Sequence, residues 1–251
     1  MSEPQGDGRG ARYTLLRELG AGGFGTVHLA YDRVMQREVA LKELRRDLVD
    51  SRDPTAGELR GRLLREVQIT GQLEHPGIVP VYDLADDASE TGTFYTMRVV
   101  RGQKLEHAIA TFHERRQRGA ADPLELPRLL TALIGICNAI GYAHSRGVMH
   151  RDLKPANVLL GEFGEVVLLD WGLAKVAGDP PDEPSARSEA TSVRIKTDTP
   201  HDTAVGGAVG TPAYMAPEQA RGEPGPHTDV YGLGAILFEL LTGRAPHQGK
   251  D

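Results

Sequence analysis

The residues best suited to chemistry lie between positions 150 and 160, where an acid, a base and an amide fall within six positions. Asp152 can accept a proton from a hydroxyl group. Lys154 can neutralise charge on a transferring phosphoryl group, and Asn157 offers an oxygen ligand to a hard cation. Thirteen residues after Asn157, Asp170 supplies a second oxygen ligand at the end of an apolar strand. These residue types point to chemistry on a phosphoryl group near a divalent cation.

A glycine cluster near the N-terminus offers a place for phosphates. Residues 19–27 read LGAGGFGTV and match the pattern G-x-G-x-x-G-x-V. Glycine lets the backbone approach phosphate oxygens without a Cβ in the way, although an ordinary hairpin turn has a similar composition. A Rossmann fingerprint would require a helix to open at the third glycine, whereas the residues after Gly25 read as a strand. We therefore expect a β-hairpin that covers phosphates.

Lys42 ends the apolar strand segment VALK, seventeen residues after Gly25. An unpaired lysine is costly to bury, so it is either an edge lysine that reaches water or a phosphate ligand with a carboxylate behind it. Glu66 on the following helix is the candidate carboxylate. Glu58 on the same helix is a weaker candidate, and a surface glutamate is the alternative for either.

The secondary-structure patterns differ between the first and the second part of the chain. They predict an α+β protein with two lobes. Residues 1–12 are polar and rich in glycine, and we expect a disordered leader there. Residues 13–100 alternate like strands and contain one helical pattern, whereas residues 101–251 are mostly helical. The predicted strands cover 13–44 (three strands), 78–84, 93–100, 158–160 and 166–169; the predicted helices cover 58–73, 103–118, 126–146 and 230–241; and 178–212 is a predicted loop.

The amino-acid composition excludes several classes of protein. The 251 residues are 39% hydrophobic and 25% charged, as in ordinary globular proteins. The net charge of −6 lacks the basic footprint of a nucleic-acid-binding protein. The single cysteine, Cys137, excludes a disulfide within the chain, and its apolar neighbours predict a core position. With no secretory signal and no run of about 20 apolar residues, we expect no membrane segment and a cytoplasmic location.

Taken in order, these motifs resemble those of eukaryotic-type serine/threonine protein kinases, and the resemblance covers about residues 13–248. Lys154 and the segment GTPAYMAPE at 210–218 resemble the serine/threonine branch rather than the tyrosine branch. The Glu218–Gln219 pair and the segment 74–79 are similar to bacterial members. The segments that carry the resemblance are 19–27, 39–42, 150–157, Asp-Trp-Gly at 170–172, Ala-Pro-Glu at 216–218 and Asp-Val-Tyr-Gly at 229–232.

The resemblance implies the two-lobed protein kinase fold and a role for each matching residue. A small β-rich N-lobe with one helix, residues 13–100, would bind ATP, and a mostly helical C-lobe, residues 101–251, would carry the catalytic and activation segments. Lys42 would hold the α- and β-phosphates and pair with Glu66. Met97 would gate the adenine pocket, with residues 98–100 as the hinge. The implied ATP-binding residues are Leu19, Gly20, Ala21, Gly22, Gly23, Phe24, Gly25, Thr26, Val27, Ala40, Lys42, Met97 and Leu159.

The resemblance also implies the catalytic roles. Asp152 would orient and deprotonate a protein serine or threonine hydroxyl, while Lys154 neutralises charge. Asn157 and Asp170 would hold Mg²⁺. Thr211 would sit beside Asp152, and Asp229 would brace the catalytic loop. The chain itself is a further expected substrate, through autophosphorylation between residues 185 and 211 that orders this segment on Arg151.

Two departures from the family pattern leave alternatives open. Trp171 replaces the usual phenylalanine after the metal-binding Asp170, and its ring can fill the same apolar slot. The chain stops at Asp251, where the family continues with further C-lobe helices, one of which supplies an arginine to the position of Glu218. We therefore expect a truncated C-lobe and partial exposure of 230–241. An inactive kinase-like fragment or pseudokinase that binds a nucleotide or a partner is the alternative, and a small-molecule phosphotransferase is disfavoured by the segment 216–218.

Overall fold

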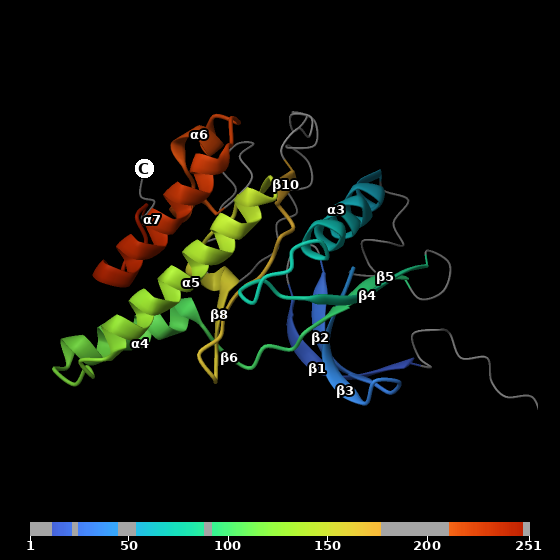
Figure 1. The fold of residues 1–251 in the computed structure, drawn as a ribbon, viewed down its shortest axis with the longest axis horizontal. Coiled ribbons are helices and arrows are strands. Elements are labelled where there is room, and N and C mark those ends of the chain that lie inside the picture. Colours follow the sequence, from blue (N-terminus) through green and yellow to red (C-terminus); the bar gives the residue numbers. More distant parts are fainter. Residues whose placement is uncertain (1–11, 22–24, 45–53, 88–91, 177–210, 248–251) are drawn as a thin grey trace, which may run out of the picture. The chain divides into compact units, whose positions relative to one another are not determined.

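The computed structural model describes residues 12–21, 25–44, 54–87, 92–176 and 211–247, and its chain divides into two compact units (Figure 1). We call the first, residues 1–72 and 79–99, the N-unit. The second, residues 73–78 and 100–251, is the C-unit. The segment 73–78 belongs with the C-unit although the chain then returns to the N-unit. Its Gly77 carbonyl accepts a hydrogen bond from the backbone N–H of Leu168 at 2.8 Å, which ties it to a C-unit strand.

The described residues of the N-unit form a five-stranded antiparallel sheet and one long helix. The strand order is β1-β2-β3-β5-β4. The predicted helix begins earlier than expected, because Pro54 has the fixed φ that suits a first helical turn. The elements are β1 (Tyr13–Ala21), β2 (Thr26–Asp32), β3 (Arg37–Glu43), α3 (Pro54–Thr70), β4 (Val81–Asp87) and β5 (Gly92–Met97). The expected strand start at Ile78 was wrong, since Ile78 forms an isolated bridge with Leu168.

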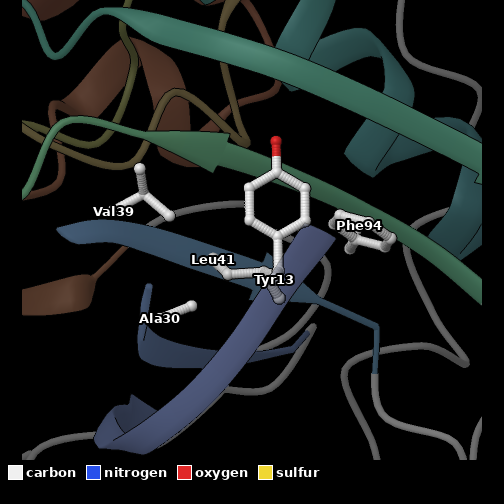
Figure 2. Close-up of a cluster of buried hydrophobic side chains, with 5 residues drawn as sticks. All are labelled: Tyr13, Ala30, Val39, Leu41 and Phe94. Carbon is white, nitrogen blue, oxygen red and sulfur yellow. The ribbon is translucent and has the colours of Figure 1, made fainter. Parts of the chain in front are cut away.

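Two apolar clusters lie on the two faces of this sheet. One gathers Tyr13, Ala30, Val39, Leu41 and Phe94, with the rings of Tyr13 and Phe94 meeting edge to face at 5.9 Å (Figure 2). The other joins Leu44 and Tyr95 to Leu63 and Val67 of α3. Successive side chains of a strand point to opposite faces, so β3 alternates between the two clusters. Lys42, next to Leu41, therefore lies on the face that α3 covers.

The part of the C-unit that the structure describes forms helices and two small sheets. Helix α5 packs against α4 and α7, and β8 pairs with both β6 and β9. The helices are α4 (Leu105–Gln117), α5 (Glu125–Ser145), α6 (Pro217–Ala220) and α7 (Pro226–Thr242); the strands are β6 (Gly102–Lys104), β7 (Val148–Met149), β8 (Val158–Gly161), β9 (Val166–Leu168) and β10 (Lys175–Val176). The 3₁₀ turns are η1 (Pro155–Asn157) and η3 (Pro212–Tyr214). Strands β6, β7 and β10 were not predicted, because two or three residues are too few to show alternation.

Helix α5 is apolar on most of its surface, which made its inward face hard to predict. Its buried residues recur every three or four positions, as in Leu129, Ala132, Ile136 and Ala139. Cys137 lies on the exposed side, so the predicted core position was wrong. Among the described residues α5 alone is long and apolar enough to cross a membrane. Core helices of soluble proteins meet the same test, so this is weak evidence for a span, and α5 packs on α7.

Helix α7 is buried on one side only. Thr228, Asp229, Gly232 and Ile236 face the protein, whereas Val230 is 61% exposed and Phe238 and Leu241 are also exposed. The expected partial exposure of 230–241 is therefore confirmed. Gly232 permits a close approach, because a Cβ there would lie 2.8 Å from the Cβ of Leu153. The helix thus packs directly against the segment that carries Asp152.

Candidate active site

In the N-unit, four of the expected ATP-binding residues share one face of the sheet. Val27 pairs with Lys42 across β2 and β3, and Ala40 pairs with Met97 across β3 and β5. Directly paired residues project from the same side of a sheet. Val27, Ala40, Lys42 and Met97 therefore form one surface on the side of α3. This arrangement can place an apolar ring near the lysine ammonium group.

The glycine-rich segment is a hairpin between β1 and β2, as expected, with Gly20 paired to Val27 and Ala21 paired to Thr26. A Cβ at Gly25 would lie 2.4 Å from the carbonyl oxygen of Glu43, so this glycine lets β2 approach β3. A Cβ at Gly20 would meet nothing within 4 Å. Leu19 is exposed. Gly22, Gly23 and Phe24 lie outside the described residues.

Lys42 and Glu66 form an ion pair. The ammonium nitrogen lies 2.8 Å from Oε1 and 2.9 Å from Oε2 of Glu66, and the Glu66 side chain is only 7% exposed. Tyr95 donates a hydrogen bond from its hydroxyl to Oε1 of Glu66 at 2.8 Å. Glu66 is therefore a buried partner of Lys42 and not a surface residue. The side chain of Glu58 lies outside the described residues.

In the C-unit, the Asp152 carboxylate is surrounded by donors. Its Oδ2 lies 3.1 Å from the Lys154 ammonium group and accepts a hydrogen bond from the Asn157 amide at 3.1 Å. Its Oδ1 accepts hydrogen bonds from the backbone N–H and the hydroxyl of Thr211 at 3.2 and 3.3 Å. The Lys154 ammonium group also donates to the Thr211 hydroxyl. These contacts fix a carboxylate that can receive a proton beside a cation that can offset negative charge.

The two expected metal ligands lie on neighbouring segments. The backbone N–H of Leu169 donates to the carbonyl of Asn157 at 2.8 Å, and Asp170 follows directly with a positive φ of 58°. The Asn157 amide nitrogen is held by Asp152, which fixes the orientation of its oxygen. Among the described residues no group of three His, Cys, Asp or Glu side chains could hold a metal. Two oxygen ligands nevertheless fit Mg²⁺, which usually keeps several waters and binds substrate phosphates.

Asp229 anchors the catalytic segment from α7. Its carboxylate accepts hydrogen bonds from the backbone N–H groups of His150 and Arg151 at 2.9 and 2.8 Å, and from Nε2 of His144 at 2.7 Å. Burial by itself raises the pKa of Asp229, but these hydrogen bonds, together with the nearby His150, outweigh burial and leave the pKa below its usual value. Arg151 has a φ of 66°, and this anchoring stabilises that uncommon conformation.

Trp171 occupies the position at which the sequence departs from the family pattern. Its side chain is 1% exposed, and its ring lies 4.7 Å from that of His150. The buried indole N–H has no hydrogen-bond partner among the described residues. The larger ring is therefore fully accommodated, at the cost of one unsatisfied donor.

Several contacts at the site were not predicted. Tyr95, His144 and Gln219 contact Glu66, Asp229 and the Arg151 carbonyl, respectively. Their partners are 29, 85 and 68 residues away in the chain, so no local pattern pairs them. Glu218 accepts a hydrogen bond from the Thr228 hydroxyl at 3.3 Å. Leu159 lies in β8, paired with Lys104 and Val167. Residues 185–210 of the expected autophosphorylation segment lie outside the described residues.

Comparisons with known proteins show the family to which the chain belongs. Residues 13–251 match the protein kinase domain family, so the chain belongs to the protein kinase family. It is 41% identical over 238 residues to the serine/threonine-protein kinase PknD of Protochlamydia amoebophila, covering 93% of this chain and 23% of that protein. It is 39% identical over 249 residues to PknD of Chlamydia felis, covering 95% of this chain and 25% of that protein. The chain thus spans about a quarter of the length of these curated relatives.

Proposed function

We propose that the chain transfers the γ-phosphoryl group of ATP to serine or threonine hydroxyls of proteins. The observation that carries this proposal is the surrounding of Asp152, whose carboxylate contacts Lys154, Asn157 and Thr211. This arrangement combines a proton acceptor with a fixed cation, which phosphoryl transfer to a hydroxyl requires. Membership of the protein kinase family supports the same reaction.

The N-unit binds the nucleotide. Lys42, oriented by Glu66, contacts the α- and β-phosphates through its ammonium group, and the glycine hairpin covers the phosphates with backbone N–H groups. Val27, Ala40 and Met97 provide the apolar surface for adenine, with Leu159 contributing from the C-unit chain segment. The ion pair supports this role because a buried carboxylate holds the lysine in one place.

The C-unit carries out the transfer. Asp152 orients the acceptor hydroxyl and takes its proton as the new phosphate ester bond forms, while the bond between the γ-phosphorus and the β–γ bridging oxygen breaks and ADP leaves. Lys154 offsets charge on the transferring group, and Asn157 and Asp170 supply the oxygen ligands for Mg²⁺. When bound, Mg²⁺ would neutralise charge on the phosphate oxygens. Catalysis then consists mostly of positioning and electrostatic stabilisation, since the enzyme forms no covalent bond to the substrate.

The partners follow from this chemistry. Substrates are proteins that present serine or threonine, and the chain is its own substrate between residues 185 and 211. The reaction takes place in the cytoplasm, where ATP and Mg²⁺ are available and a single cysteine stays reduced.

The test is a phosphate-transfer assay with radiolabelled ATP, Mg²⁺ and a generic basic protein, followed by hydrolysis and separation of the phosphoamino acids. The proposal expects label on serine or threonine of the basic protein and of the chain, and none when Mg²⁺ is chelated. Nucleotide binding without any transferred label would contradict it and would favour a binding module. Label on small molecules but not on proteins would also contradict it.

A further inference from the structure

We propose that the Tyr95 hydroxyl is a positioning group for the Lys42–Glu66 ion pair, and that it fixes the Glu66 carboxylate in its paired orientation. This inference rests on the proposed function, in which Lys42 binds the phosphates of ATP. The Tyr95 hydroxyl donates to Oε1 of Glu66 at 2.8 Å, and the same oxygen lies 2.8 Å from the Lys42 ammonium group. One carboxylate oxygen is thus shared by the two donors.

The position of Tyr95 follows from the pairing of β5 with β3. Tyr95 lies directly opposite Lys42, so both side chains project from the face of the sheet that α3 covers. The Tyr95 ring is 4% exposed and packs in the cluster with Leu63 and Val67 of α3. The ring is therefore held between sheet and helix, and its hydroxyl reaches the helix residue that pairs with Lys42.

Lys42 and Tyr95 both donate to Glu66, but only Lys42 also binds phosphate in the proposed function. A bound phosphate must compete with Glu66 for the N–H groups of Lys42, whereas the Tyr95 hydroxyl remains on the carboxylate. A buried carboxylate that loses a donor is costly. The Tyr95 hydroxyl therefore still donates a hydrogen bond to the buried Glu66 carboxylate when the Lys42 ammonium group turns toward a phosphate. The Lys42 ammonium group also lies 5.9 Å from the centre of the Tyr95 ring, within the range of a favourable cation–π contact.

The variant Tyr95→Phe tests this role, because it removes one hydroxyl and keeps the packed ring. The matched control is Tyr31→Phe, an exposed tyrosine on β2 of the same sheet. One readout is kcat and KM for ATP. The other is the acetylation rate of Lys42 by dilute acetic anhydride, measured by mass spectrometry relative to Lys104. The second readout requires no turnover, and a paired ammonium group reacts slowly as a nucleophile.

A hydrogen bond to a charged group corresponds to about 10- to 150-fold in the equilibrium it stabilises. Allowing for partial relaxation, we expect Tyr95→Phe to lower kcat/KM about 5- to 50-fold and to raise the relative acetylation of Lys42 about threefold or more. Tyr31→Phe should change neither. Unchanged Lys42 acetylation in Tyr95→Phe would overturn the inference, even if the unfolding temperature falls.

A double-mutant cycle with Glu66→Ala shows whether Tyr95 acts through Glu66. If it does, adding Tyr95→Phe to Glu66→Ala changes Lys42 acetylation by no more than about twofold. If Tyr95→Phe raises Lys42 acetylation as much in the Glu66→Ala background as in the wild type, the inference is contradicted. If the wild-type chain transfers no phosphate, the proposed function fails, but the acetylation measurements still decide the role of Tyr95.

Discussion

Oδ1 of Asp152 accepts two hydrogen bonds from Thr211, one from its backbone N–H and one from its hydroxyl, across 59 residues of chain. Thr211 lies directly before η3, and Tyr214 in that turn donates a hydrogen bond to Glu239 of α7 at 2.6 Å. The segment around Thr211 is therefore attached to the same helix that anchors the catalytic segment through Asp229. Helix α7 therefore supports both the segment that carries Asp152 and the segment that donates hydrogen bonds to it.

The contact between Thr211 and Asp152 predicts a difference between two substitutions. Thr211→Val removes the hydroxyl that links Lys154 to Asp152, whereas Thr211→Ser keeps it. Because this link orients charge where the phosphoryl group transfers, we expect kcat for Thr211→Val to fall about 10- to 100-fold. Thr211→Ser should remain within about threefold of the wild type. Steady-state kinetics at saturating ATP check this, and equal rates for the valine and serine variants would contradict it.

The glycine hairpin predicts that two of its glycines matter for different reasons. Gly25→Ala forces a Cβ against the Glu43 carbonyl, so we expect a loss of roughly 1–3 kcal/mol in unfolding free energy. Gly20→Ala meets no neighbouring atom, so the unfolding temperature should hardly change. If the hairpin covers phosphates, Gly20→Ala instead weakens ATP binding. Calorimetric titration and thermal unfolding of both variants separate the effects, and reversed results would refute this assignment.

Asp229 predicts a pH-dependent contribution to stability. Because its pKa is lower in the folded protein than the ordinary value of about 3.9, the charged carboxylate stabilises the fold above about pH 4. This contribution is lost as the pH falls through the folded pKa. We expect Asp229→Asn to lower the unfolding free energy at pH 7 by about 1–3 kcal/mol, because one of the two acceptor oxygens becomes an amide NH2 group that cannot accept a hydrogen bond.

The measurement is thermal unfolding of the wild type and Asp229→Asn between pH 7 and pH 3. The difference between their unfolding temperatures should shrink as the pH falls below about 4. A difference that stays constant over this range would mean that the charge of Asp229 does not contribute as its surroundings indicate.

From the surroundings of Trp171 we predict that phenylalanine, the family's usual residue at this position, is tolerated. Trp171→Phe removes a buried N–H that has no partner among the described residues, which relieves about 1–3 kcal/mol of desolvation cost. The smaller ring leaves a cavity of comparable cost. We therefore expect stability within about 1 kcal/mol of the wild type and nearly unchanged kcat. Trp171→Ala is the contrasting variant, and it should lower the unfolding free energy by about 3–5 kcal/mol.

Local sequence patterns were sufficient for the elements whose burial differs between faces. Alternation in β3, the spacing of apolar residues in α3 and the long apolar runs of α5 and α7 placed these elements within a few residues. The inward face of α5 could not be predicted, because apolar residues surround the whole helix, and Cys137 was misplaced for that reason. Strands such as β7 are defined only by a distant partner, β10, and carry no signal of their own.

In the site, too, residues that are close in sequence could be predicted, whereas contacts between residues far apart in sequence could not. Asp152, Lys154 and Asn157 are adjacent in sequence, so their juxtaposition was predictable. The supporting contacts were not predictable, since the backbone N–H of Arg151 donates to Asp229 across 78 residues and the Tyr95 hydroxyl donates to Glu66 across 29. The contact of Tyr95 depends on the register between β3 and β5, and a shift of one residue would turn its side chain to the other face.

The role of Asp152 is tested by the rate at which Asp152→Asn transfers phosphate, measured beside its affinity for MgATP. Asp122→Asn, which changes an exposed carboxylate in the C-unit, is the matched control. We expect Asp152→Asn to transfer phosphate about 10²- to 10³-fold more slowly while it binds MgATP within about threefold of the wild type. Asp122→Asn should keep the wild-type rate. Transfer by Asp152→Asn at the wild-type rate would contradict the assignment of Asp152 as the proton acceptor, and with it the proposed mechanism.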